Sequence, residues 1–226
     1  MKIRQKPAEK VWADFQEQSK LSNEQLQKFQ QYAAYLLECN QFFNITAINE
    51  LSGVVRQHFQ DSLAIQDFID MNSIKTIADI GTGGGFPGIP LKIMYPHLNV
   101  ILLEVTKKKQ EFLADVIKIL ELENVTIYGL DWRTFLRNTD YKPDLFVSRA
   151  ALADLELIRM FRPACMYNKV PLVYWASKEW EPHKKTQPFV QRIESYKLAH
   201  KERRLVFMGA STMNADDKKS DNDKNK

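Results

Sequence analysis

Apolar residues change their spacing along this chain near residue 74. Between residues 22 and 70 they recur every three or four positions, as Leu26, Phe29, Leu36 and Leu37 do, which predicts amphipathic helices. Beyond residue 74, short apolar runs alternate with helical patterns, and such alternation is typical of a doubly wound parallel sheet. The predicted strands cover residues 74–80, 99–103, 125–128, 145–147 and 170–175, and the predicted helices cover residues 86–95, 107–122 and 151–160.

The last part of the chain follows a different pattern. Residues 189–199 and 203–208 resemble two strands around a short charged turn, which predicts an antiparallel hairpin at the edge of the sheet. The expected fold is therefore α/β, with a doubly wound, mostly parallel, seven-stranded Rossmann-like sheet. We expect a helical extension over residues 1–73, the sheet domain over 74–210, and a disordered polar tail over 211–226.

Two helices are predicted within the extension. Ser22 and Gln25 have the spacing of a capping box ahead of the first helix. The second helix is expected from about residue 51 to residue 70, with an apolar side that includes Phe59 and Leu63. Both patterns are explained by helices that pack on a core.

Composition narrows the functional classes. The two cysteines lie far apart, which argues against a disulfide framework and a cysteine zinc site, and the four histidines show no metal-ligand spacing. No segment has the apolar length of a signal peptide or a membrane span, so we expect a cytoplasmic protein without a membrane or metal partner. Heptads are missing from the sequence, and a monomer is expected. The net charge of +4 is compatible with a nucleic-acid partner without establishing one.

The candidate cofactor loop covers residues 79–90. An apolar strand, an acid and the glycines Gly81, Gly83 and Gly85 predict a turn that lets a ligand approach the main chain, followed by a helix whose amide end faces that ligand. A dinucleotide-binding loop needs a third glycine where this chain has Phe86. The pattern therefore favours S-adenosylmethionine over a nicotinamide dinucleotide.

Polar residues also follow the other predicted strands, at the edge of the sheet where ligands bind. Asp79 lies beside the glycine loop, and Glu104 ends the second strand, where a carboxylate can accept both hydroxyls of a ribose. Asp131 and Trp132 follow the third strand, where an acid can accept from an adenine amino group. Arg149 ends the fourth strand, where an acceptor must meet the cofactor, and is the candidate catalytic residue. Each of these residues also has a purely structural interpretation: the charged side chains could be solvated at the surface, and Trp132 could belong to the core or fill space at the surface.

Other catalytic devices are missing from the sequence. No Asn-Pro-Pro-Tyr or Asp-Pro-Pro-Tyr motif follows the fourth strand, and neither Cys39 nor Cys165 has the setting of a nucleophile that attacks a pyrimidine ring. A site without a dedicated base or covalent nucleophile suits an acceptor that carries no proton. Guanine N7 is such an acceptor, because its methylation needs alignment and exclusion of water more than proton removal.

Several stretches together resemble a known family. They are residues 44–48, 56–63, 79–90, 107–109, 112–113, 120–125 and 148–150, and they span roughly residues 20–180 in the family order. The chain resembles the bacterial 16S ribosomal RNA methyltransferases that modify a guanine at N7, known as RsmG or glucose-inhibited division protein B. The resemblance implies a class I methyltransferase that uses S-adenosyl-L-methionine, with 16S rRNA of the 30S ribosomal subunit as its partner.

The resemblance also implies roles for particular residues. Gly81, Gly83 and Phe86 would line the cofactor site, Trp132 and Arg133 would contact the adenine edge, and the arginine that ends the fourth strand would lie near the methyl-transfer centre. The helical extension would contribute residues near the cofactor or RNA entrance, namely Asn44, Arg56, His58 and Asp61.

Substrate binding would rest on basic side chains that meet phosphates. The candidates are Lys107, Lys108, Lys109, Arg133, Arg137, Arg149, Lys178, Lys184, Lys185, Arg203 and Arg204. His58 taken alone is equally a buried core histidine. The chain departs from the family pattern at 130–133, at Lys178-Glu179 and at 159–169. These departures concern the residues expected to contact the adenine edge and those expected on the rim that faces the RNA.

Alternative functions follow from the same residues. A nicotinamide-dependent oxidoreductase is disfavoured by Phe86 and by the lack of a Tyr-x-x-x-Lys pair. A non-catalytic RNA- or ribosome-binding protein that retains the fold would bind the cofactor without transferring its methyl group. A methyltransferase for an acceptor other than RNA is a further alternative, and cofactor binding together with methyl transfer separates all of these.

Overall fold

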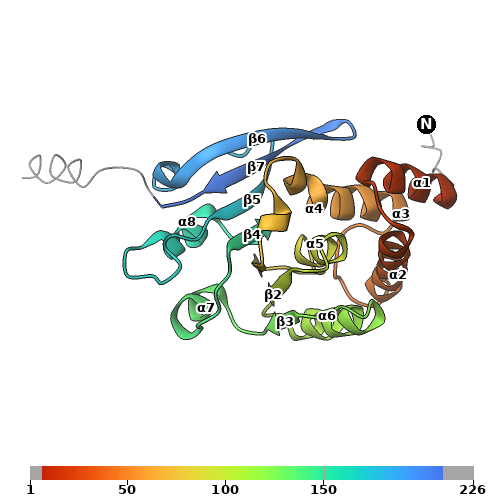
Figure 1. Ribbon diagram of the computed structural model, residues 1–226, viewed down its shortest axis with the longest axis horizontal. Helices are drawn as coiled ribbons and strands as arrows, with labels where there is room; N and C mark the ends of the chain where they lie inside the picture. Colours follow the sequence, from red (N-terminus) through yellow and green to blue (C-terminus); the bar gives the residue numbers. More distant parts are fainter. Residues whose placement is uncertain (1–6, 150, 211–226) are drawn as a thin grey trace, which may run out of the picture.

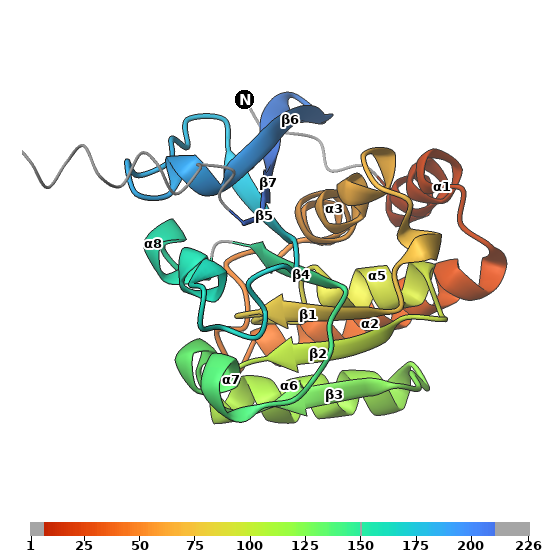
Figure 2. The same ribbon diagram turned by 60° about the vertical axis from the view of Figure 1, so that its left-hand side comes forward.

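The computed structural model describes residues 7–149 and 151–210. Seven strands form one sheet in the order β3-β2-β1-β4-β5-β7-β6, with helices on both faces (Figures 1 and 2). The strands are β1 (Thr76–Ile80), β2 (Asn99–Leu103), β3 (Val125–Tyr128), β4 (Leu145–Arg149), β5 (Leu172–Ser177), β6 (Val190–Leu198) and β7 (Lys201–Met208). Strands β1 to β5 are parallel, whereas β7 runs antiparallel to β5 and β6. The predicted doubly wound sheet and its edge hairpin are confirmed.

The order of the strands reverses beside β1. The chain places β2 and β3 on one side of β1 and then crosses back to place β4 and β5 on the other side. The register pairs Ile80 with Leu103 of β2 and with Ser148 of β4, so the carboxyl ends of these strands share one edge. Ligands of doubly wound sheets bind at such a switch point.

Alternate residues of the strands pack against different layers of helices. Ile77 and Leu102 belong to a core with α5 (Gly88–Met94), α6 (Lys107–Ile119) and the N-terminal helices. Ala78 and Ile101 face a second core with α7 (Trp132–Asn138) and α8 (Asp154–Leu157). This division follows from the period of two residues in a strand, and it explains the nearly continuous apolar runs that predicted these strands.

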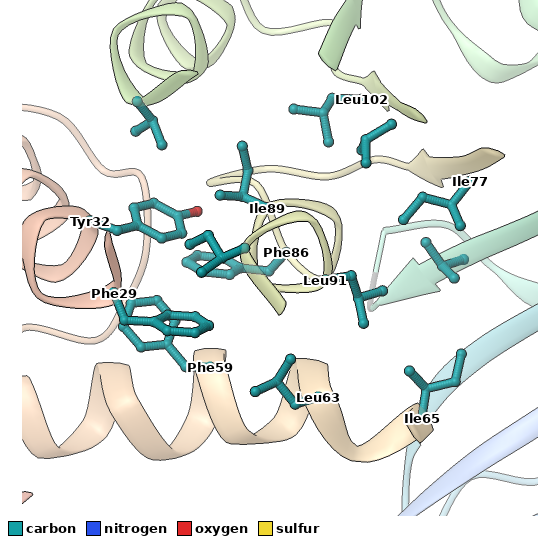
Figure 3. Close-up of a cluster of buried hydrophobic side chains, with 14 of the residues drawn as sticks. Phe29, Tyr32, Phe59, Leu63, Ile65, Ile77, Phe86, Ile89, Leu91 and Leu102 are labelled. Atoms are coloured by element: carbon teal, nitrogen blue, oxygen red, sulfur yellow. The ribbon is translucent and has the colours of Figure 1, made fainter. Parts of the chain in front are cut away.

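The N-terminal helices are joined to the sheet through aromatic residues. Helix α1 (Ala8–Ser19) and helix α2 (Asn23–Asn40) precede a continuous helical run from residue 51 to residue 67. Phe29, Tyr32 and Phe59 contact Phe86 or one another within this core (Figure 3). The extension therefore shares one hydrophobic core with one face of the sheet.

The capping box of α2 is present, because Ser22 Oγ accepts from the Gln25 backbone and Gln25 Oε1 accepts from the Ser22 backbone. The run from residue 51 comprises α3 (Leu51–Gly53), a π-helical segment (Val54–Gln60), α4 (Asp61–Leu63) and a 3-10 segment (Ala64–Asp67). The periodicity predicted a helix here but not its π-helical section. Such sections are frequent at functional sites.

Several predicted boundaries were wrong. Helix α5 begins at Gly88 rather than near Phe86, and β5 begins at Leu172 because Pro171 has no N–H to donate to the ladder. The helix expected over 151–160 is shorter, with α8 followed by a 3-10 turn (Ile158–Phe161). Helix α7 was not predicted.

The described residues contain no helix that is long and apolar enough to cross a membrane. The predicted tail over 211–226 lies outside the described residues, as do residues 1–6 and 150.

Candidate active site

A cavity of about 720 Å³ opens at the carboxyl edge of the parallel strands. The loops after β1, β2, β3 and β4 contribute to its lining, together with the loop before α3, the π-helical segment and the start of β7. Eleven of the candidate residues named from the sequence line it, namely His58, Asp61, Gly81, Gly83, Phe86, Glu104, Lys109, Asp131, Trp132, Arg149 and Arg203. The polar and glycine residues predicted at the ends of four strands therefore meet in one cavity, as the sequence pattern indicated.

The glycine loop turns with three left-handed residues, Gly81, Gly83 and Gly85, whose φ angles are 66°, 60° and 96°. A Cβ added at Gly83 would meet no atom of the described residues within 4 Å, so this position faces open space in the cavity. A Cβ at Gly85 would lie 2.6 Å from Tyr32 Oη, on the packed side of the loop. Gly83 therefore lets a ligand approach the main chain, whereas Gly85 allows the loop to pack.

Asp79 supports the loop from behind rather than lining the cavity. Its Oδ2 accepts from Thr82 Oγ1 at 2.6 Å and from the Gly88 backbone N–H at 2.7 Å. The side chain is fully buried, and burial raises the pKa of Asp79 to about 6, although these hydrogen bonds act in the opposite direction. Asp79 thus shapes the loop through these hydrogen bonds, and its contact with a cofactor stays a prediction.

Glu104 joins two loops at the cavity wall. Its Oε2 accepts from the Gly83 backbone N–H at 3.0 Å, and its Oε1 accepts from the Thr106 N–H at 2.8 Å. A carboxylate offers about four lone pairs, so these bonds leave acceptor capacity at both oxygens. Val105 and Leu130 lie beside it and are 61% and 56% exposed, which leaves apolar surface for a planar ligand.

The residues after β3 are divided between the cavity and the fold. Asp131 caps α7 by accepting from the Thr134 N–H and hydroxyl, which lower its pKa. Trp132 is buried, and its indole N–H donates to the Glu156 carbonyl at 3.0 Å. Arg133 does not line the cavity, because its guanidinium donates twice to the Glu156 carboxylate at 2.9 Å. The adenine contact of Arg133 stays a prediction, and in the structure its side chain is engaged by Glu156.

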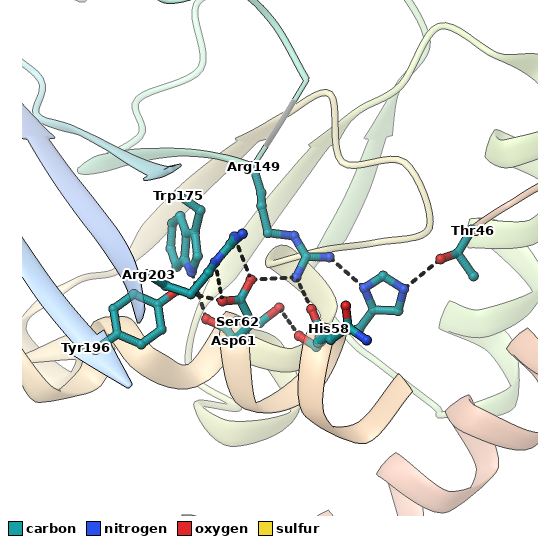
Figure 4. Close-up of polar contacts among 9 residues, drawn as sticks. Thr46, His58, Asp61, Ser62, Arg149, Trp175, Tyr196 and Arg203 are labelled. Carbon is teal, nitrogen blue, oxygen red and sulfur yellow. Dashed lines mark hydrogen bonds and ion pairs between the residues drawn. The ribbon is translucent and has the colours of Figure 1, made fainter. Parts of the chain in front are cut away.

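Arg149 lies at the end of β4 and is fixed by three partners of the π-helical segment and α4 (Figure 4). Its Nη1 donates to the Gln57 carbonyl at 2.9 Å and to Asp61 Oδ2 at 3.2 Å. Its Nη2 donates to His58 Nδ1 at 2.9 Å. These bonds use three of the five donors of a guanidinium and leave two for a ligand.

His58 is held as a neutral imidazole. Its Nδ1 accepts from Arg149, so the proton of the neutral ring lies on Nε2, which is 2.7 Å from Thr46 Oγ1. Burial, and then the charge of Arg149, lower the pKa of His58 to about 3. The ring stacks on Phe86 with centroids 4.2 Å apart. The lone pair of the neutral ring is therefore engaged by Arg149, and this contact helps to hold the guanidinium in place.

Asp61 connects this site to the hairpin (Figure 4). Its carboxylate, 2% exposed, accepts from Tyr196 Oη at 2.6 Å, from Arg203 Nε and Nη2 at 3.2 Å, and from Arg149. Its backbone carbonyl accepts from the Trp175 indole at 2.7 Å. Asp61 thus links the extension to β4, β5, β6 and β7.

Four of the predicted substrate residues lie outside the cavity lining, whereas Lys109 and Arg203 belong to it. Asn44 lies in the loop after α2 and Arg56 in the π-helical segment, while Lys107 begins α6 and Lys178 forms an ion pair with Glu202 at 3.0 Å. Tyr196 was missed entirely, and Arg203 had been noted only as a basic residue. No cluster of three or more metal-ligating side chains occurs among the residues that the structure describes.

The strand order, the glycine loop after β1 and the carboxylate after β2 define a Rossmann-like fold of the class I methyltransferase type. The fold is similar to that of TrmK from M. capricolum, solved in complex with the cofactor product S-adenosylhomocysteine. That structure has a TM-score of 0.50 and 9% identity and covers 69% of this chain and 70% of TrmK.

The comparison of sequences is more specific. Residues 25–206 match the GidB family model, described as rRNA small subunit methyltransferase G. The ribosomal RNA small subunit methyltransferase G of Aster yellows witches'-broom phytoplasma (strain AYWB) is 36% identical over 193 residues, which cover 84% of this chain and 85% of that protein. Its counterpart from Onion yellows phytoplasma (strain OY-M) is 35% identical over 195 residues, covering 85% and 86% of the two chains. The chain belongs to the rRNA small subunit methyltransferase G family.

Proposed function

We propose that this protein transfers a methyl group from S-adenosylmethionine to N7 of a guanine in 16S rRNA of the small ribosomal subunit. The observation that carries the proposal is a single cavity that holds the open face of Gly83, the carboxylate of Glu104 and the fixed guanidinium of Arg149. Membership of a family described as rRNA small subunit methyltransferases supports the choice of acceptor.

The cavity fits the proposed cofactor. The Gly83 main chain would lie against the amino-acid part, the spare lone pairs of Glu104 would accept from the ribose hydroxyls, and Val105 and Leu130 would contact the adenine faces. When bound, S-adenosylmethionine supplies an electrophilic methyl group on a sulfonium. Gly81, Phe86, Asp131 and Trp132 complete the proposed site.

The acceptor would lie on the Arg149 side of the cavity. The two unused N–H donors of Arg149 suit an acceptor edge such as guanine O6, and this contact would orient N7. Guanine N7 carries no proton, so the engaged lone pair of His58 is no disadvantage. The role of the protein is to align the reacting groups and to exclude water.

The test is methyl transfer from labelled S-adenosylmethionine to 30S subunits from a strain that lacks this activity. The label should fall on one guanine, at which borohydride and aniline then cleave the RNA, as expected for an N7-methylated ring. Cofactor binding without incorporation would contradict the proposal and favour a binding protein that retains the fold. Incorporation that resists this cleavage would contradict the assignment to N7.

The proposal includes a monomeric protein in the cytoplasm, with Asn44, Arg56, Lys107 and Lys178 as contacts to RNA outside the cavity. Sedimentation of the purified chain tests the monomer, and a dimer at micromolar concentration would contradict it. Alanine substitution at each of the four positions should weaken binding of 30S subunits without changing the affinity for S-adenosylhomocysteine.

A further inference from the structure

A second concave surface lies beside the active site. It is a groove of about 450 Å³ between α7 and the segment that follows α8. We call it the arginine groove, and its lining consists of Arg133, Leu136, Arg137, Arg159, Arg162, Ala164, Cys165 and Met166. Four of the eight lining residues are arginines from two separate segments, and the function proposed above does not use them.

The groove is positively charged. Glu156 offsets part of its charge by pairing with Arg133 at 2.9 Å and Arg159 at 2.8 Å, and these hydrogen bonds lower the pKa of Glu156 to about 2. Arg137 and Arg162 are exposed and have no ion-pair partner in the described part of the chain. The shared carboxylate fixes two guanidiniums, and the other two are available to an anion.

The groove is continuous with the active site. A shallow depression between them shares Asp131, Trp132 and Leu152 with the cavity, and it shares Arg133 and Arg137 with the groove. A chain whose one unit enters the cavity could therefore extend along the depression into the groove. Figure 2 shows α7 and α8 side by side at this end of the molecule.

We infer that the arginine groove binds the phosphate backbone of the RNA strand next to the acceptor guanine. Guanidinium groups bind phosphate in a bidentate manner and stack on exposed bases, which suits arginine better than lysine in such a groove. Leu136 and the exposed Met166 provide apolar surface for sugars or bases between the phosphates. The inference rests on the proposed function and identifies a binding surface for its substrate.

The test is a double variant, Arg137→Ala with Arg162→Ala, which removes two unpaired charges. The matched control is Lys75→Ala with Lys118→Ala, which removes two exposed charges that lie outside the cavity and the groove. The groove variant should raise the KM for 30S subunits roughly tenfold, with kcat and the affinity for S-adenosylhomocysteine unchanged. For two contacts to single-stranded RNA, the slope of log KM against log salt should fall by about 1.4. An unchanged slope, or an equal effect in the control, would overturn the inference.

A binding measurement separates this inference from the proposed reaction. Cys165 lies in the groove, and Cys39→Ser leaves it as the single thiol of the chain. In that background, a 16S rRNA fragment should slow alkylation of Cys165 at least fivefold, whether or not methyl transfer occurs, and the Arg137→Ala/Arg162→Ala change should abolish the protection. Protection by polyglutamate but not by RNA would overturn the inference in favour of an acidic protein segment.

Discussion

Replacement of Asp61 by asparagine tests the role of the buried carboxylate in the most direct way. The substitution keeps the size and removes the charge. Asp61 Oδ1 accepts from Tyr196 and Arg203, and Oδ2 accepts from Arg149 and Arg203. Whichever oxygen is replaced by the amide NH₂, a donor then faces a guanidinium donor. The variant therefore loses the charge and one side of the hydrogen-bond network together.

The expected cost follows from burial. Removing one partner of a buried ion pair costs about 3–5 kcal/mol, because the remaining charges are left without a counter-ion. The side chains of Arg149 and Arg203 are 11% and 26% exposed, so partial solvation places the cost near the lower end, at about 3 kcal/mol. Methyl transfer should fall as well, because Arg149 loses one of its three anchors.

Glu156→Gln is the matched control. Glu156 also pairs with two arginines, but its side chain is 29% exposed, and exposed pairs contribute about 1 kcal/mol or less. Urea denaturation of both variants at neutral pH gives the two free energies of unfolding. If Asp61→Asn costs no more than Glu156→Gln, burial does not determine the strength of this network and the reasoning is wrong.

Three further predictions concern pH and the glycine loop. The pKa of His58 is about 3 in the folded protein and near 6.5 in the unfolded chain, so the unfolded chain takes up a proton as the pH falls. In urea denaturation, the free energy of unfolding of the wild type should therefore fall between pH 7 and pH 5 by roughly 2 kcal/mol more than that of His58→Gln. Equal losses in the two proteins would refute this prediction. The pKa of Asp79 rises on folding from 3.8 to about 6, so the stability that its protonated form contributes is lost as the pH rises. Asp79→Asn should therefore gain stability relative to the wild type between pH 4 and pH 6, and a constant difference in the free energy of unfolding would contradict this. Gly83→Ala should lower the free energy of unfolding by about 1–2 kcal/mol, because residue 83 has a positive φ angle. Calorimetry should also show that the variant binds S-adenosylhomocysteine at least tenfold more weakly, because the added Cβ would point into the cavity. An unchanged affinity would mean that the ligand binds elsewhere.

The sequence predicted the features that depend on local patterns. The strand runs, the capping box of α2 and the glycine turn are each encoded within a few residues, and the parallel topology then places Glu104 and Arg149 at one edge. The resemblance to a known family added His58 and Asp61 of the helical extension, which also line the cavity. The family itself was also predicted correctly.

The contacts that the sequence did not predict join distant segments. Tyr196 and Arg203 meet Asp61 across 135 and 142 residues, and no spacing rule connects such positions. Arg133 has a cationic side chain at the predicted place, yet the nearby carboxylate of Glu156 directs it away from the cavity. The sequence pattern thus predicts the backbone position of a functional residue, whereas the direction of its side chain depends on hydrogen-bond partners that are distant in the sequence.

The central claim is that Arg149 positions the acceptor for methyl transfer in this cavity. The most direct measurement is single-turnover transfer from labelled S-adenosylmethionine to 30S subunits by the wild type and by Arg149→Ala, with the affinity for S-adenosylhomocysteine measured for both. We predict transfer to one guanine by the wild type, a rate at least roughly 100-fold lower in the variant, and affinities within tenfold of each other. A variant that transfers as fast as the wild type, or a wild type that binds S-adenosylhomocysteine and transfers nothing, would contradict the claim.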